Sequence, residues 1–333
     1  MTTDLVEEAP QRADSSEETR PLARLIAVGV LVLIFGVVVK VQGGPQDYLS
    51  IFAWLWLLAV AWRIEARPVT HLAFLRDWSI PLVLLMFYFY TREIADNLGI
   101  PVHYSYVIDI DVWLGGGDTP SARLQEMWCG SPCDATAGAA WYDRFFILVW
   151  MSHFTVALTV AVVFWLRNRA EFVKWMRRYL IINFTALVCY IVVPTAPPWM
   201  ASMEGRLPTE VQRLGARAWV GPKPDGVGEV DPAAWVGNQV AAMPSLHTGV
   251  AVMVALYAVY RLTSPWRWLT LLYPLSMGTA LVYLGEHYVA DLLGGVVLAV
   301  LVLGACTRWE AWRRRGRDER PVDALAPSPS LNG

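Results

Sequence analysis

The sequence predicts an all-α integral membrane protein with about eight transmembrane helices. Three observations carry this prediction: 56% of the 333 residues are hydrophobic, only 17% are charged, and long apolar runs recur along the chain. Soluble domains carry about 25% charged residues, and the mean hydropathy of this chain is +0.39. Seventeen tryptophans and thirteen tyrosines fit the same class, because amphipathic rings collect at membrane interfaces.

Both ends of the chain are predicted to lie outside the membrane. Residues 1–21 are acidic and polar and have no apolar periodicity, which is typical of a disordered tail. This tail lacks the basic start and the small-residue cleavage site of a signal peptide, so we expect it to be retained. Residues 308–333 begin with clustered arginines and become rich in proline and serine. The membrane domain is therefore expected to span residues 22–307.

Eight apolar runs lie between these tails. They cover residues 22–41, 48–62, 78–90, 145–166, 179–193, 247–261, 268–284 and 288–306. A transmembrane helix needs about 20 predominantly apolar residues, and the first run meets this length by itself. Two polar loops, 97–141 and 200–240, interrupt the series. Residues 121–128 within the first loop predict a short interfacial helix.

Basic residues predict the orientation. The short segments rich in Lys and Arg are 63–76, 167–178, 261–267 and 308–317. They hold three, five, two and five such residues, whereas the turns at 42–47 and 285–287 hold none. Positive residues mark cytoplasmic loops. Eight spans then place both termini in the cytoplasm and both long loops on the outer face of the cell membrane.

Two boundaries between a polar loop and an apolar helix each carry a histidine. Met243-Pro-Ser-Leu-His247 precedes the sixth helix, and His287-Tyr-Val-Ala-Asp291 precedes the eighth. The chain between them forms a helix, a basic turn and a second helix, so it returns to the face that it left. We therefore expect the two imidazoles to meet at one depth. Asp291 follows His287 by four residues, which places both on one helix face.

These residue types suit phosphoryl transfer. A covalent mechanism needs an oriented nucleophile, an acid for the leaving group and positive charge around the phosphoryl oxygens. Histidine serves near neutrality because its ordinary pKa is about 6.5. The Asp291 carboxylate can hold one nitrogen of His287 protonated and leave the other for attack, while His247 serves as the acid. The free N–H groups at the start of the helix that follows His247 favour binding of a phosphate.

Other interpretations of these residues remain open. His-x-x-x-Asp is also metal-ligand spacing, and His247 could complete a three-ligand zinc site. His71 and His103 are predicted to be interfacial residues, and His153 is predicted to form a hydrogen bond between helices. Cys129 and Cys133 lie in a polar loop. They form a disulfide if that loop faces an oxidising side of the membrane, or they remain two free thiols.

The two histidine motifs, Met243–His247 and His287–Gly295, resemble the second and third signatures of the type 2 phosphatidic acid phosphatase superfamily. Leu246 and the Pro-x-Ala-Pro-Pro-Trp segment at 194–199 are similar to its inositol phosphorylceramide synthase-like branch. The resemblance covers roughly residues 80–305. It implies a helical membrane core in which His287 is the nucleophile, Asp291 orients it and His247 is the general acid. It also implies that no metal and no cofactor take part.

The chain departs from the superfamily pattern in its cations. No Lys-x6-Arg-Pro signature precedes Pro244, and Ala280-Leu281 stands where a Ser-Arg pair is expected. Another cation must then bind the phosphate. Arg92 is the first candidate, because a charge at the outer end of an apolar span is costly without a purpose. Weaker candidates in the outer loop are Arg206, Arg213, Arg217 and Lys223.

Ser245 has two expected roles, since its hydroxyl can donate to a phosphate oxygen or cap the following helix. The sequence thus predicts transfer or hydrolysis of a phosphoryl-type group on a membrane lipid, through a phosphohistidine at the outer face. The partners are a lipid phosphate or phospholipid, with water or an alcohol such as inositol as acceptor, and no nucleic acid. The alternative is a non-catalytic lipid carrier or scaffold, favoured by the missing arginines and opposed by the retained histidines and Asp291.

Overall fold

The structure is a computed structural model that describes residues 21–42, 48–95, 98–135, 138–215 and 239–318. Throughout these ranges the chain forms helices and no strand, and isolated bridges join Thr195 to His103 and to Ala241. The all-α prediction is confirmed for this part of the chain. The predicted tails lie outside the described residues, apart from Pro21 and residues 308–318. The latter continue the last helix, so the helix does not end at the predicted domain boundary.

The helices have the following bounds. They are α1 (Pro21–Gln42), α2 (Tyr48–Trp62), α3 (Pro68–Ala95), α4 (Ser105–Leu114), α5 (Pro120–Trp128), α6 (Trp141–Arg167), α7 (Arg169–Val192), α8 (Pro198–Met203), α9 (Leu246–Arg261), the 3-10 helix η2 (Pro265–Leu271), α10 (Leu272–Tyr283) and α11 (Val289–Asp318).

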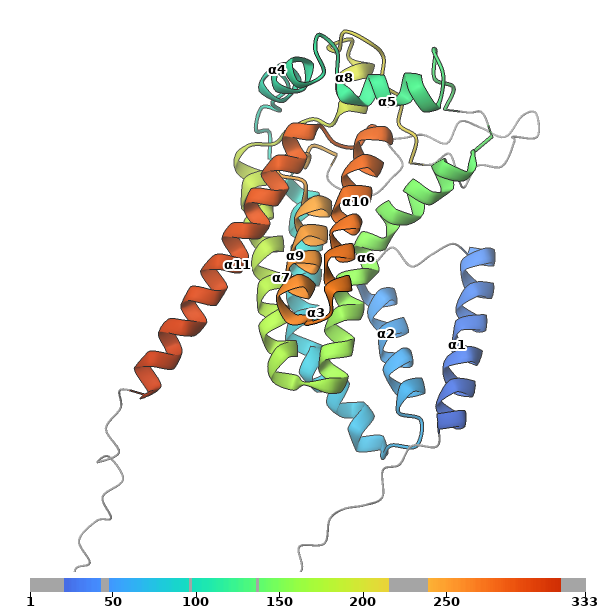
Figure 1. Ribbon diagram of the computed structural model, residues 1–333, viewed down its shortest axis with the longest axis vertical. Helices are drawn as coiled ribbons and strands as arrows, with labels where there is room; N and C mark the ends of the chain where they lie inside the picture. Colours follow the sequence, from blue (N-terminus) through green and yellow to red (C-terminus); the bar gives the residue numbers. More distant parts are fainter. Residues whose placement is uncertain (1–20, 43–47, 96–97, 136–137, 216–238, 319–333) are drawn as a thin grey trace, which may run out of the picture.

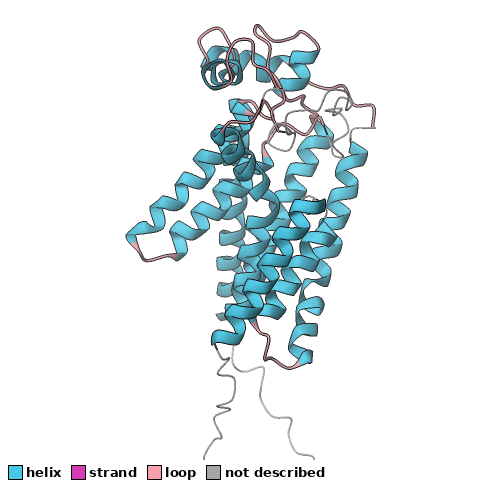
Figure 2. Ribbon diagram, turned by 90° about the vertical axis from the view of Figure 1, so that its right-hand side faces the viewer, coloured by secondary structure: helices cyan, strands magenta, loops and turns pink. Residues whose placement is uncertain are grey.

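The long helices form a bundle that is covered at one end. Helices α4, α5 and α8 lie across this end, and we call them the cap (Figures 1 and 2). The N-terminal end of α1 and the C-terminal end of α11 lie at the opposite end (Figure 1). The connection that carries His287 joins α10 to α11 beneath the cap. The bundle therefore has a capped end with the histidine motifs and an open end with the basic helix termini.

Five helices are long and apolar enough to cross a membrane: α1, α3, α6, α7 and α11. Helices α2 and α9 are apolar but shorter, and α10 has 12 residues preceded by η2. These features support a multi-pass membrane protein. The predicted eight spans correspond to these eight helices, of which three fall short of a full span by length.

Two predicted boundaries were wrong. Helix α3 begins at Pro68, ten residues before the predicted start, because its polar first turns are held in place: Asp77 accepts hydrogen bonds from Trp165 Nε1 at 3.1 Å and from Arg169 at 2.8 Å. The basic segment 167–178 is no loop, since Asn168 alone separates α6 from α7. The Asn168 side chain caps α7 by accepting the N–H groups of Ala170 and Glu171.

Helices α9 and α11 approach each other at glycines. A Cβ on Gly295 would lie 2.3 Å from the carbonyl oxygen of Ser245, and a Cβ on Gly249 would lie 3.2 Å from the carbonyl oxygen of Gly295. At this crossing the N–H of Ser245 donates to the carbonyl of Asp291 at 2.9 Å. The two glycines thus allow a backbone contact that joins the two histidine motifs directly.

The glycine contact makes a prediction about stability. We expect Gly295→Ala to lower the melting temperature of the detergent-purified protein, because the new methyl group must push α11 away from Ser245 at a cost of about 1–3 kcal/mol or more. The matched control is Gly304→Ala in the same helix, where nothing lies within 4 Å of the added Cβ. This control should keep or raise the melting temperature, since alanine is the better helix former. Equal melting temperatures for both variants would contradict the tight crossing.

Candidate active site

His247 and His287 lie side by side at the capped end. His247 belongs to the first turn of α9, and His287 belongs to the connection before α11. Their ring centroids are 5.6 Å apart. The structure thus brings together the two imidazoles that the sequence places 40 residues apart.

Asp291 lies behind His287. Its carboxylate is fully buried, and its Oδ2 accepts the N–H of Tyr288 at 2.9 Å. The same oxygen lies 3.4 Å from Nδ1 of His287, slightly beyond the usual hydrogen-bond range. Because Nδ1 faces the carboxylate, Nε2 points to the other side of the ring. This arrangement suits an imidazole that is oriented by an acid and attacks through Nε2.

A third histidine, His153 of α6, packs against His247 with ring centroids 4.2 Å apart. The prediction that His153 forms a hydrogen bond between helices was wrong: its buried Nδ1 has no partner among the described residues, and neither has Nε2 of His247. The ring faces the other imidazole instead. Trp150, His153 and Ala157 are buried at helical intervals on one face of α6, but the contact with His247 comes from a distant segment that spacing within α6 does not reveal.

Arg92 lies near the end of α3 and interacts electrostatically with His153 and His247. The cations predicted as weaker candidates behave differently. Arg206 pairs with Glu204 at 2.7 Å, and Arg213 pairs with Glu286 at 2.9 Å. The other two, Arg217 and Lys223, lie outside the described residues. Among the described candidates, Arg92 is the cation that accompanies the imidazoles.

Ser245 is fully buried and caps α9, because its Oγ accepts the N–H of Thr248 at 3.3 Å. The preceding Pro244 is held by the hydroxyl of Tyr190, which donates to its carbonyl at 2.9 Å. One of the two predicted roles of Ser245 is therefore present. Its contact with a phosphate remains a prediction.

The side chains of the described residues do not form the zinc site that the sequence left open. Within the described ranges, no group of three or more His, Cys, Asp and Glu side chains is arranged to hold a metal ion. Cys129 and Cys133 do form a disulfide at the end of α5, which settles the alternative left open by the sequence. This bond closes the polar segment next to the cap.

The connection that carries His287 is fixed by the cap. Gln125 of α5 is buried, and its Nε2 donates to the carbonyls of Gln212 and Tyr283 at 2.8 and 2.9 Å. Its Oε1 accepts the N–H of Gln212 at 2.8 Å. Gly285 has a φ of +74°, and a Cβ there would lie 2.6 Å from the carbonyl of Gln212. Only glycine adopts this conformation so close to another backbone without strain.

Asp111 of α4 holds the start of α11. Its carboxylate accepts the N–H groups of Val289 and Ala290 at 2.9 and 3.0 Å, which satisfies two of the free donors at the helix start. Burial raises the pKa of Asp111 to about 6; the two hydrogen bonds oppose this rise, and the Asp291 carboxylate adds to it. Gln125 and Asp111 were not predicted from the sequence, because their partners lie more than 80 residues away.

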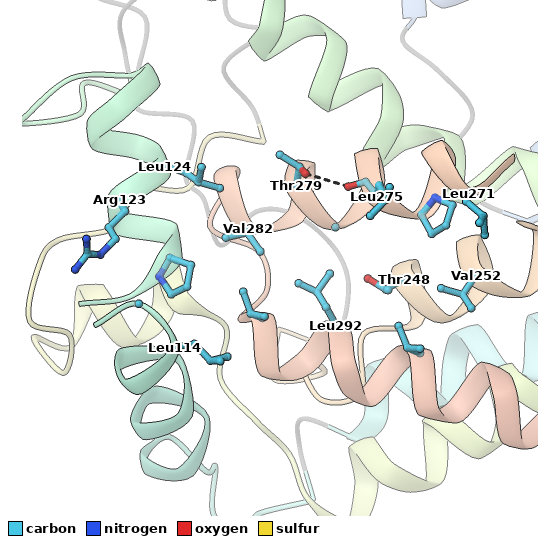
Figure 3. A pocket seen from close by; sticks show the side chains of 16 residues that line it. Leu114, Arg123, Leu124, Thr248, Val252, Leu271, Leu275, Thr279, Val282 and Leu292 are labelled. Carbon is cyan, nitrogen blue, oxygen red and sulfur yellow. Dashed lines mark hydrogen bonds between the residues drawn. The ribbon is translucent and has the colours of Figure 1, made fainter. Parts of the chain in front are cut away.

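An apolar groove of about 850 Å³ runs beside the site between α10 and α11. Leu275 and Val282 of α10 face Leu292 of α11 across it, and Thr248 of α9 forms part of its floor (Figure 3). Arg123 of α5 lies at one end (Figure 3). Thr248, which lines the groove, directly follows His247 in α9.

These features define a class of protein: a multi-helix membrane protein with two adjacent histidines and a buried aspartate at one end of its bundle. The sequence model of the PAP2 superfamily matches residues 129–305, more than half of the chain, and the chain belongs to this superfamily. The resemblance stated from the sequence is thereby confirmed. No solved structure matches the chain.

Three relatives are synthases of inositol-containing ceramide lipids. The inositol phosphorylceramide synthase of Candida albicans is 26% identical over 130 residues, which are 36% of this chain and 26% of that protein. The catalytic subunit aur1 of the Schizosaccharomyces pombe enzyme is 24% identical over 245 residues, 63% of this chain and 56% of that protein. The phosphoinositol dihydroceramide synthase of Bacteroides thetaiotaomicron is 27% identical over 184 residues, 51% of this chain and 58% of that protein. Each match spans less than two thirds of the relative.

The raised pKa of Asp111 predicts a pH dependence of stability. A carboxyl whose folded pKa exceeds its ordinary value of about 4 stabilises the protein below that pH, and this contribution is lost as the pH rises through about 6. We expect the melting temperature to fall between pH 4 and pH 6, and Asp111→Asn to flatten this fall. Asp109→Asn, an exposed residue of the same helix, should retain the slope of the unaltered protein. Identical slopes for all three proteins would overturn the assignment.

Proposed function

We propose that the protein is a lipid phosphotransferase or phosphatase that acts at the outer face of the membrane through a phosphohistidine. The observation that carries the proposal is the placement of Asp291 behind His287 with His247 5.6 Å away. Membership of the PAP2 superfamily and the likeness to inositol phosphorylceramide synthases support the reaction class. Residues 22–307 would form its single catalytic domain.

The first step is attack on phosphorus. Nε2 of His287 forms a bond to the phosphorus of the lipid donor, and the bond to the leaving alkoxide breaks. His247 donates its proton to that oxygen, so the alcohol leaves neutral. Asp291 holds Nδ1 of His287 protonated and stabilises the positive imidazole that forms, as a carboxylate does in other catalytic triads.

The second step releases the group from His287. An acceptor hydroxyl attacks phosphorus, His247 takes its proton, and the bond between phosphorus and Nε2 breaks. Water as acceptor makes the enzyme a phosphatase, and a lipid or inositol hydroxyl makes it a transferase. The likeness to synthases of inositol-containing ceramide lipids favours transfer of a phosphoinositol group to a ceramide-type hydroxyl.

Arg92 is proposed to balance the charge of the phosphoryl oxygens, in place of the arginines that the superfamily pattern places elsewhere. His153 is proposed to contact the same oxygens, because it lies against His247 with a buried Nδ1. Preorganised donors of this kind act strongly where water is excluded. The proposed catalytic set requires no metal ion and no cofactor.

The lipid is proposed to enter from the membrane through the groove between α10 and α11. The groove is lined by aliphatic side chains, which suit an acyl or alkyl chain. It runs from Leu271, the last residue of η2, along α10 to Val282, a length of about 17 Å at 1.5 Å per residue. Ser245 would donate to a phosphoryl oxygen while its Oγ caps α9.

The outer orientation rests on charge and on the disulfide. Basic helix ends at the open end of the bundle favour the cytoplasmic side, which would place both chain termini inside the cell. The Cys129–Cys133 bond lies at the capped end, and disulfides persist on oxidising sides of membranes. Both features therefore support an active site that faces outward.

The first test of the proposal is an assay with radiolabelled lipid phosphates and phospholipids, with and without inositol. We expect His287→Ala and His247→Ala to lower turnover by about three orders of magnitude or more, as loss of a nucleophile or its acid does. His103→Ala, in the segment before α4, is the matched control and should keep its activity. Activity should also persist in EDTA.

The outcomes separate the alternatives. Activity that survives His287→Ala would sink the nucleophile assignment, and activity that EDTA abolishes would restore the zinc interpretation. Binding of labelled lipid without turnover in the unaltered protein would favour the non-catalytic carrier. Label released as phosphate identifies a phosphatase, and label on inositol or on a lipid alcohol identifies a transferase.

Another prediction concerns the side chains proposed to contact the phosphate. We expect Arg92→Gln to lower kcat/KM by about 100-fold, the effect of removing one donor from a developing anion, and Arg92→Lys to keep part of the activity. His153→Gln should reduce kcat/KM in the same direction. The control is Arg144→Gln, an exposed arginine at the start of α6, and it should change little. Full activity of both Arg92 variants would show that another cation binds the phosphate.

A further inference from the structure

A second cavity lies at the open end of the bundle, far from the imidazoles. It measures about 860 Å³ and lies between α7, α9 and the C-terminal half of α11. Figure 1 shows this half of α11 diverging from α7 toward its C-terminal end. Arg308 in the cavity follows Asp291 by 17 residues of the same helix, which is about 26 Å at 1.5 Å per residue. The cavity is therefore separate from the candidate active site.

The cavity is rich in positive charge. Among the residues that the structure describes, five cationic side chains and the single carboxylate Glu310 line it. The cations are Lys174, Arg178, Arg261, Arg308 and Arg314. Glu310 is already shared, because it accepts from Arg177 at 2.9 Å and from Arg178 at 2.8 Å. The positive charge of the cavity thus exceeds the negative charge of its walls.

The nearby carboxylate Glu171 is shared as well. It pairs with Lys174 at 2.8 Å and with Arg261, and it accepts the hydroxyl of Tyr257 at 2.8 Å. Arg308 and Arg314 are exposed and form no ion pair with any residue that the structure describes. These two arginines are available to an anion.

The same cavity has an aliphatic wall. Val300 and Leu301 of α11 line it and are 51% and 64% exposed. Gly304 follows on the helix, and nothing lies within 4 Å of a Cβ placed there. Apolar surface beside unpaired arginines matches a molecule with an aliphatic chain and an anionic head.

We propose that this cavity binds one anionic glycerophospholipid as a site distinct from the catalytic one. Its phosphate lies between Arg308 and Arg314, and one acyl chain runs along Val300 and Leu301 toward the membrane centre. Basic pockets between transmembrane helices recognise anionic head groups in this way. The lipid fills the wedge between α11 and α7 and stabilises α11, the helix that carries Asp291 in its first turn.

The test is native mass spectrometry of the full chain in detergent, with dioleoyl phosphatidylglycerol or dioleoyl phosphatidylcholine added. We expect the protein to retain one phosphatidylglycerol in preference to phosphatidylcholine. The double variant Arg308→Gln/Arg314→Gln should weaken this binding by about 30-fold, from two surface arginines. The readout is binding, so it does not depend on the reaction catalysed at the other end.

The matched control is Arg313→Gln/Arg315→Gln, which removes the same charge from the same helix end but from residues that do not line the cavity. This control should keep the lipid. Equal losses in the two double variants would show a general charge effect and overturn the site. Equal retention of phosphatidylglycerol and phosphatidylcholine would overturn the role of the charged head group. Competition by water-soluble glycerol 3-phosphate as strong as that by phosphatidylglycerol would overturn the role of the acyl chain.

Discussion

The candidate active site depends on the backbone contact between α9 and α11. The hydrogen bond from Ser245 N–H to the Asp291 carbonyl joins the two histidine motifs main chain to main chain, and Gly249 and Gly295 remove the side chains that would prevent it. Membrane helices gain little from the hydrophobic effect on association, so small residues and hydrogen bonds decide how closely they pack. The separation of the imidazoles is therefore set by rigid backbone.

The cap fixes the site from above by satisfying buried backbone groups. Gln125 binds the end of α10 and the segment that contains Gln212, and Asp111 caps the helix that carries Asp291. A buried donor or acceptor without a hydrogen-bond partner lowers the stability of the fold by about 1–3 kcal/mol. Displacement of the cap would leave several backbone groups without partners and would destabilise the protein accordingly. Cap and connection thus specify each other's position, and the segment between α3 and α6 is part of the site.

Hydropathy predicted the fold class and the positions of the apolar runs, and the motifs predicted which histidines meet. The extent of the helices could not be predicted in the same way. Apolar runs mark the portion at membrane depth, whereas α3 and α7 extend into polar sequence because Asp77 and Asn168 find local partners. His153 and Asp111 escaped prediction because their roles arise from contacts with distant segments. The pairing of Cys129 with Cys133 needed the geometry of the loop.

The unpaired polar atoms at the capped end argue for a ligand, and Asp291 distinguishes a catalyst from a carrier. Nδ1 of His153, Nε2 of His247 and Oδ1 of Asp291 are buried without hydrogen-bond partners within the described residues, a costly arrangement that is typical of functional sites. A protein that only held a phosphate would need donors and positive charge. A buried carboxylate behind an imidazole adds negative charge near the phosphate and weakens its binding. The same carboxylate helps an imidazole that becomes positive during attack, so its position is useful to a nucleophile and a disadvantage to a carrier.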